Sequence, residues 1–507
     1  MGLRARAVGA LVALACVAVA GCGSSGRPPS ALDPARVIPL NAIAYVELTV
    51  RPQGAQRDDV ESALTKLLGH SPDADIQRVA ESIFRGSGLR YQQDVEPWLG
   101  QRIAFVATAP SKAGVALIAP TDDPQAAAAA LARGERRHGP FVTRSFAGVT
   151  YKVANEPGTP VAFGTVGHYA VIGGTSAFKQ IVDAYRSTTY APLRLPSGSL
   201  MNAYVNGPRA IAAIESLPTI SAQARQQLRT TLGRAHLPAA LSFSLSVSSH
   251  TLTADFRSLG PRASHASAGG ADVKGLPGDS WLAISTGSSF ARYFSAGFNA
   301  GFLQGFSRAA RASGVSPTVL LGQFRQRTGI DLTRDLLPAL GPFQFAMEGS
   351  SITALRAALA LYPSDPAAGA RLVGDLHNLA ARAHSLRVIG GSRSFRFGPA
   401  SLPFPIVGVA DLGRKIIAKF ALSNTHPATG KLSANPVFVR ARAQLPAGST
   451  VPLFLNFGPL AALLSETPQF KQGGSDHNAL AVLRRLDYFA VGTSATTHDT
   501  RVVLGLH

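Results

Sequence analysis

The chain has 507 residues, of which 46% are apolar and 15% are charged, with a formal net charge of +20 at pH 7. This length allows two to four domains with cores of their own, and the positive charge favours contact with anionic surfaces. With only two cysteines, the composition excludes a disulfide framework or a metal site built from several cysteines.

The first 21 residues have the pattern of an exported bacterial protein. Arg4 and Arg6 precede an apolar run over 7–20 that is too short to span a bilayer. The run ends at Val19-Ala20-Gly21-Cys22, which resembles the lipobox of bacterial lipoproteins. We expect a signal peptide over 1–21, cleavage before Cys22 and a diacylglyceryl group on that cysteine. An ordinary secretory signal with an incidental cysteine is the alternative.

Short strands and amphipathic helices are predicted after a Gly-, Ser- and Pro-rich tether over 22–39. The helical segments carry apolar residues at i, i+3, i+4 and i+7, whereas the strand segments are short and apolar. In chain order, the patterns predict strands at 43–50, 103–108, 114–119, 149–153, 161–165, 169–172, 201–205, 241–248 and 251–258, and helices at 60–68, 76–84, 125–133, 176–186, 208–216 and 221–235.

One stretch of the chain occurs twice. Asp94-Val95-Glu96-Pro97-Trp98-Leu99-Gly100 returns 241 positions later as Asp335-Leu336-Leu337-Pro338-Ala339-Leu340-Gly341. Each copy precedes a strand-like run, which predicts a turn that feeds a strand. Leu195-Pro196-Ser197-Gly198-Ser199 likewise recurs as Leu445-Pro446-Ala447-Gly448-Ser449. Matches in the same order indicate an internal duplication.

The duplication fixes the predicted domain organisation. A first repeat over 40–260 and a second over 277–507 are joined by a linker over 261–276, which has no apolar periodicity. Strands occur in groups with helices between the groups, and strict strand–helix alternation is absent. We therefore predict an α+β fold of two tandem duplicated halves, each a largely antiparallel sheet with packed helices.

These motifs together resemble a known family. The lipobox, the Asp-x-x-Pro-Trp-Leu-Gly turn, the helix start at Gly173-Gly174-Thr175-Ser176 and the late Leu-Pro-x-Gly-Ser segment are similar to those of bacterial lipoproteins of the domain of unknown function 3352. The family has no assigned activity. The resemblance therefore implies location and architecture but no catalytic residues.

Few side chains have the spacing of a catalytic or metal site. Ser176 and Lys179 have the Ser-x-x-Lys spacing of penicillin-binding enzymes, although the companion motifs are missing and a helix cap is the simpler interpretation. His377 and His384 are seven residues apart on a predicted helix but have no carboxylate at ligand spacing. We therefore expect no catalytic residue, no metal and no cofactor.

The most unusual stretch carries a phenylalanine at every fourth position, with Gly297, Gly301 and Gly305 before the last three. On a helix, this spacing makes an apolar stripe beside a ridge of small residues. A helix packed in the core is one interpretation, and a groove for an acyl chain or a partner helix is the other. The candidate ligand-binding residues are Phe290, Phe294, Phe298, Phe302 and Phe306.

The basic residues are scattered and lack the aromatic interleaving of a nucleic-acid surface, so no nucleic acid is expected. Those of the second half include Arg382, Arg387, Arg393, Arg396, Arg414, Lys415 and Lys419. Solvated faces explain most of them, and anionic lipid headgroups or cell-wall polymers are the candidate partners.

The function predicted is a non-enzymatic binding or scaffold role for a lipoprotein anchored through Cys22 on the extracytoplasmic face of a bacterial cell membrane. An exported serine hydrolase or acyltransferase that uses Ser176 and Lys179 is the alternative.

Overall fold

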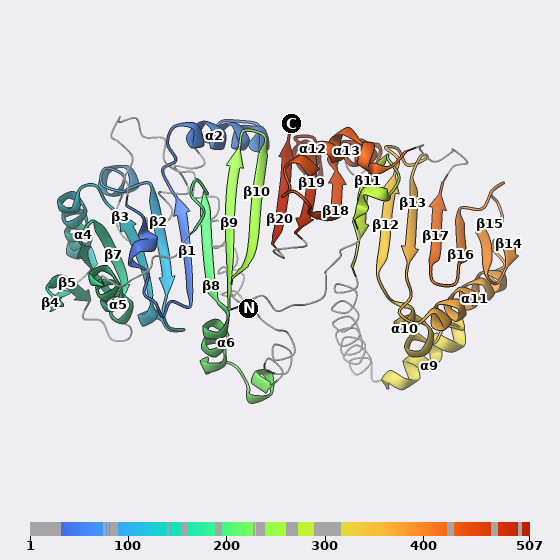
Figure 1. The fold of residues 1–507 in the computed structure, drawn as a ribbon, viewed down its shortest axis with the longest axis horizontal. Coiled ribbons are helices and arrows are strands. Elements are labelled where there is room, and N and C mark those ends of the chain that lie inside the picture. The colour runs from blue at the N-terminus through green and yellow to red at the C-terminus, as the bar shows by residue number, and fades with distance from the viewer. Residues whose placement is uncertain are drawn as a thin grey trace. The chain divides into compact units, whose positions relative to one another are not determined.

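The chain divides into two compact units, 1–264 and 265–507, in a computed structural model (Figure 1). The boundary lies within the predicted linker. The residues that the structure describes are 32–72, 74, 78, 81, 90–138, 141–154, 161–187, 195–226, 229, 239–259, 272–287, 316–422, 430–467, 475–494 and 499–507.

The strands described in the first unit all pair antiparallel with their neighbours. They follow the order β4-β5-β6-β7-β3-β2-β1-β8-β9-β10. Their bounds are β1 Ala44–Thr49, β2 Arg102–Ala107, β3 Val115–Pro120, β4 Phe141–Phe146, β5 Val149–Ala154, β6 Val161–Val166, β7 Tyr169–Gly174, β8 Met201–Asn206, β9 Ala240–Ser248 and β10 Thr251–Leu259.

Helices cover both faces of the first unit's strands because both faces carry apolar side chains. On one face, α2 (Ala55–Leu68) and α4 (Pro124–His138) pack on a core that includes Leu48, Trp98 and Phe163. On the other face, α5 (Thr175–Arg186) packs on Tyr151, Ile118 and Val171. Further helical segments of this unit are η1 Pro34–Val37, η3 Tyr91–Val95, η4 Lys112–Gly114 and α6 Gly207–Ser216.

The second unit repeats this strand order. Its strands also pair antiparallel, in the order β14-β15-β16-β17-β13-β12-β11-β18-β19-β20. Adding ten to each strand number of the first unit therefore gives the order of the second. The bounds are β11 Ser280–Ser285, β12 Phe343–Glu348, β13 Arg356–Leu361, β14 Leu386–Gly391, β15 Ser394–Pro399, β16 Val407–Asp411, β17 Ile416–Ala421, β18 Thr450–Asn456, β19 Leu486–Thr493 and β20 Thr500–Leu506.

Helices of the second unit pack on its sheet in separate cores. The long helix α11 (Pro366–Arg382) packs on Phe395, Val409 and Ile416 of β15, β16 and β17 (Figure 1). A second core gathers α12 (Pro436–Ala443) against β11, β18, β19 and β20. The other described helical segments are η5 Val273–Gly275, α9 Pro317–Thr328, η6 Leu332–Leu336, α10 Leu337–Ala339, η7 Leu432–Ala434, α13 Phe457–Glu466 and α15 Ser475–Leu483.

The predicted α+β class with antiparallel strands is confirmed. Strand β4 was not predicted, because its sequence, Phe-Val-Thr-Arg-Ser-Phe, has four exposed positions between apolar ends. Segments assigned to the tether and the linker contain packed residues. Ala35, Val37 and Ile38 are buried in the first unit, and Val273 is buried in the second. Most of the predicted helix 76–84 lies outside the described residues.

The duplicated Asp motif forms the same local structure in both units. A π-helical turn, η3 or η6, precedes the Pro-containing segment, in place of the simple turn that the sequence predicts. The buried Asp94 carboxylate accepts the Arg90 N–H at 2.9 Å and pairs with Arg133 of α4 at 3.1 Å. The buried Asp335 carboxylate accepts the Asp331 N–H at 3.2 Å and pairs with Arg371 of α11 at 2.9 Å.

Acid should destabilise both units through these aspartates. The Arg90 N–H and the Arg133 guanidinium hold the pKa of Asp94 below its usual value. Burial alone would raise the pKa of Asp335, but hydrogen bonds from Arg371 and the Asp331 N–H outweigh it and lower that pKa. The stabilisation is present above the unfolded value of about 3.9 and is lost as pH falls through the lower folded values.

Urea unfolding measured between pH 7 and pH 3 checks this prediction. Asp94→Asn with Asp335→Asn should lower the unfolding free energy at pH 7 and flatten its decline in acid. An equally steep decline in this double variant would mean that other groups cause the acid sensitivity.

Candidate functional site

The two sets of residues singled out for lipidation and ligand binding lie outside the described part of the chain. These are Cys22 and the stripe Phe290, Phe294, Phe298, Phe302 and Phe306. The structure therefore places neither of them, and both assignments remain predictions.

The Ser-x-x-Lys pair lies at the start of α5, and its two side chains have different partners. Ser176 Oγ accepts a hydrogen bond from Gln180 Nε2 at 3.4 Å. The Lys179 ammonium lies over the Phe146 ring, 5.2 Å from its centroid. A serine nucleophile needs a base within hydrogen-bond reach, and the geometry found here gives Lys179 an aromatic partner instead.

The two histidines do not come together as ligands. His377 lies in α11 and packs edge-on against Phe395, with ring centroids 5.1 Å apart. His384 follows the end of the helix and is exposed. Within the described ranges, no group of three or more His, Cys, Asp or Glu side chains could hold a metal ion.

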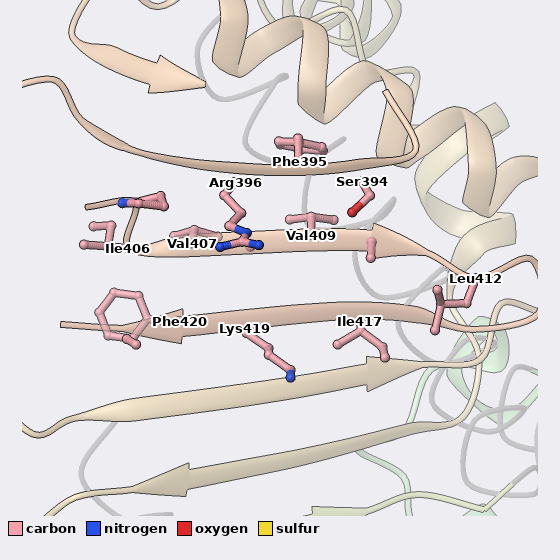
Figure 2. A pocket seen from close by; sticks show the side chains of 14 residues that line it. Ser394, Phe395, Arg396, Ile406, Val407, Val409, Leu412, Ile417, Lys419 and Phe420 are labelled. Carbon is pink, nitrogen blue, oxygen red and sulfur yellow. The ribbon is translucent and has the colours of Figure 1, made fainter. Parts of the chain in front are cut away.

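A basic hollow is the most distinctive surface feature of the second unit. Arg396 of β15, Gly408 of β16 and Lys419 of β17 lie side by side in register. Two strand spacings place the Arg396 and Lys419 backbones roughly 10 Å apart. Because Gly408 has no side chain, the floor between the two cations is open. Figure 2 shows the Arg396 side chain over β16 and the Lys419 side chain extending from β17 on the side away from β16.

The hollow has a volume of about 450 Å³ and combines cations with an apolar lining. Its apolar side chains include Ile406, Leu412 and Ile417. Both Arg396 and Lys419 are exposed, and neither side chain has a hydrogen-bond or ion-pair partner among the residues that the structure describes. The charges are therefore available to a ligand.

The charge of the surrounding strands is strongly one-sided. Segment 386–421 contains six cationic residues and a single carboxylate, Asp411. Side chains alternate between the faces of a strand, so Asp411 lies on the face of Val407 and Val409, away from Gly408. Its Oδ1 also accepts the Gly413 N–H at 2.8 Å. No acidic side chain of β14–β17 thus faces the hollow.

The corresponding face of the first unit is closed by a helix. There Tyr151 of β5 and Val171 of β7 flank the region of Gly164 in β6. Helix α5 covers this face, and its Phe178 ring stacks on Tyr151 with centroids 4.8 Å apart. In the second unit, no described helix covers Arg396, Gly408 and Lys419. Cations thus occupy positions on a face that is a buried core in the first unit.

Sequence reasoning listed Arg396 and Lys419 only among scattered basic residues. They are 23 positions apart, and nothing in their local sequence shows that β15 and β17 both flank β16. A signal was nevertheless present. Three consecutive strand segments with one carboxylate and several cations predict a positive sheet face once the meander is drawn in register.

A second hollow, of about 430 Å³, lies in the first unit between the turn at Leu40 and helix α5. Asp183 is its only charged lining residue, and Leu40 at its rim is 76% exposed. It offers no cluster of groups that would recognise a particular ligand.

Comparison with protein families gives one match. The family described as "Protein of unknown function (DUF3352)" matches residues 5–389. The chain belongs to this family. The family predicted from the motifs is therefore confirmed. No curated protein matches the DUF3352 chain.

Two solved structures are similar to part of this DUF3352 protein. Crystal form I of TP0453 is 14% identical at a TM-score of 0.25, covering 46% of this chain and 82% of TP0453. Crystal form III is 15% identical at a TM-score of 0.24, covering 46% and 84%. No helix among the residues described here is both long and apolar enough to span a membrane.

Proposed function

We propose that this DUF3352 protein is a lipoprotein anchored through Cys22 on the outer side of a bacterial cytoplasmic membrane, with a non-enzymatic binding role. The anchor is supported by the order of Arg4 and Arg6, an apolar run and small residues directly before Cys22. The observation that carries the binding role is the open basic hollow of β15–β17.

We further propose that the two units arose by duplication. The identical strand order of β1–β10 and β11–β20 supports this origin. So does the repeated pairing of a buried aspartate with an arginine on the following helix, α4 or α11. Two copies of one architecture also allow one face to keep its helix while the other becomes a binding surface.

The non-enzymatic role is favoured over the hydrolase alternative by the surroundings of Ser176. Its hydroxyl is bonded to Gln180, and Lys179 lies over Phe146. An active-site acylating probe tests this choice, because labelling of Ser176 would favour an enzyme.

The partners proposed are anionic lipid headgroups or cell-wall polymers, without nucleic acid. Removal of Arg4 and Arg6 with the signal peptide takes the formal charge from +20 to +18. Such an excess attracts anionic surfaces over about 8 Å, the Debye length at physiological salt.

Cys22→Ala should abolish lipid labelling and lipoprotein-type processing of the chain. Cys22 is the only cysteine outside the predicted signal peptide, so no second thiol can accept a diacylglyceryl group. The measurement is incorporation of a labelled fatty acid into the protein in a bacterial host. The control is Cys16→Ala, which should be labelled normally. Persistent labelling of Cys22→Ala would refute the anchor.

A further inference from the structure

We propose that the hollow of β15–β17 binds the phosphate of an anionic phospholipid headgroup between Arg396 and Lys419. This inference rests on the proposed function, because it names the ligand class for the site described there. Its test is independent of the anchor, since the hollow belongs to the folded second unit.

The first step of the argument is the placement of charge. Arg396 and Lys419 flank Gly408 in register, so their side chains rise from the two sides of one open position. A guanidinium binds phosphate through two parallel N–H donors, and an ammonium adds a compact charge. A phosphate over Gly408 would contact the Arg396 guanidinium, and the flexible Lys419 side chain can rotate toward it from β17.

The second step is the apolar lining. Ile406 and Ile417 line the same hollow as the two cations, and Leu412 at its rim is 62% exposed. A free inorganic anion would leave these side chains in water. A headgroup with its glycerol and first methylenes would cover them, which favours a lipid over a small hydrophilic anion.

The third step compares two possible occupants of the hollow, a lipid and a protein helix. A helix covers the matching face in the first unit. Helix α5 packs there on Tyr151 and Val171. An apolar helix over Arg396 and Lys419 would bury two unpaired cations, at a high energetic cost. A phosphate neutralises both.

Proximity to lipid follows from the proposed anchor. Only 12 positions separate Cys22 from Pro34, where η1 begins. A chain of this length spans at most about 40 Å when fully extended. In the anchored protein, the start of the first unit therefore lies within about 40 Å of the bilayer surface.

The test uses the lipid-free chain from residue 23 onward, which keeps every residue that the structure describes. Its binding to phosphatidylcholine vesicles with and without phosphatidylglycerol is measured by co-sedimentation at low salt. We expect binding to the anionic vesicles only. Arg396→Gln with Lys419→Gln should weaken it roughly thirtyfold, since two basic residues near a membrane surface contribute about 1 kcal/mol each.

Two matched variants separate the site from overall charge. Arg257→Gln with Arg327→Gln removes the same charge from exposed positions outside the hollow, and should weaken binding less than about threefold. Gly408→Val keeps the charge but fills the floor between the cations. A Cβ at Gly408 has only one neighbour within 4 Å, Arg396 Cγ at 3.7 Å, so the strand can accept it. This variant should bind as weakly as the Arg396/Lys419 pair.

Three outcomes would overturn the proposal. If both charge-removing pairs lost the same vesicle affinity and Gly408→Val lost none, binding would depend on overall charge and not on the hollow. Absence of binding to anionic vesicles would exclude a phospholipid as the ligand of the hollow. The anchor would be unaffected, because Cys22 labelling tests it separately. Binding of inorganic phosphate or of an acidic protein that depends on Arg396 and Lys419, without vesicle binding, would assign the hollow to that ligand instead.

Discussion

Glu47→Ala should lower the unfolding free energy of the first unit by about 3–5 kcal/mol, the usual cost of removing one partner of a buried ion pair. The Glu47 carboxylate is 2% exposed. It accepts hydrogen bonds from Tyr45 at 2.7 Å, Arg102 at 2.6 Å and Asn202 at 3.0 Å. Burial and the Glu47 charge raise the pKa of Tyr45 well above its usual value, so the hydroxyl remains a donor. Without Glu47, three donors lose their common acceptor.

Urea unfolding followed by tryptophan fluorescence measures this loss, because the chain has two tryptophans and each unit contains one, Trp98 or Trp281. The matched control is Glu61→Ala. Glu61 pairs with Arg57 at 2.8 Å on the exposed side of α2, and a surface pair of this kind contributes about 0.3–0.5 kcal/mol. Similar losses in the two variants would show that the Glu47 cluster is not a stabilising element.

Much of the fold follows from periodicity, as β1 and α5 illustrate. The run 43–50 is apolar and bounded by turn residues, and the helix over 176–186 has its apolar residues at helical spacing; both elements form within one or two positions of the prediction. Such patterns report which residues must be buried. They do not report a buried charge such as Glu47, which the sequence pattern counts simply as one polar position in a strand.

The duplicated Asp motif shows a different limit. Its two copies were recognised, but as turns, whereas Asp94 and Asp335 each lie at a π-helical turn and bind an arginine 36 or 39 positions later. The partner of a buried carboxylate depends on which helix packs over it. That information resides in the tertiary arrangement and not in the motif.

The charge of strands β15–β17 is visible in the sequence, but the place of Arg396 and Lys419 on the two sides of one strand is not. Arg396 and Lys419 belong to strands separated by β16, and their meeting depends on the register of two hairpins. The face is open because no described helix lies over it in the second unit, whereas α5 covers the matching face of the first unit. Neither the register nor the uncovered face can be read from the residues next to Arg396 or Lys419 in the sequence.

Gly341→Ala should destabilise the second unit by about 3 kcal/mol, the upper end of the range for forcing extra atoms into a packed site. A Cβ at this position would lie 2.0 Å from the carbonyl oxygen of Tyr362 and 3.0 Å from Ser364 N. Both are backbone atoms, so relief requires the chain itself to move. That movement would disturb the bond from Tyr362 N–H to Pro342 O, which is 2.8 Å long.

The equivalent glycine of the first unit gives a graded comparison, and a helical glycine gives the control. A Cβ at Gly100 would meet Pro120 O at 2.9 Å, a smaller overlap, so Gly100→Ala should cost less than Gly341→Ala. Gly322 lies in α9 with nothing within 4 Å of an added Cβ, and alanine is favoured over glycine in helices by about 1 kcal/mol. Gly322→Ala should therefore be neutral or stabilising.

Thermal unfolding of the three variants measures the order of their stabilities. Equal stability of Gly341→Ala and Gly322→Ala would mean that the backbone around Gly341 can move without a loss of stability. The expected order instead makes Gly341 the position where the backbone of the repeated motif and that of the Tyr362 segment approach too closely for any side chain.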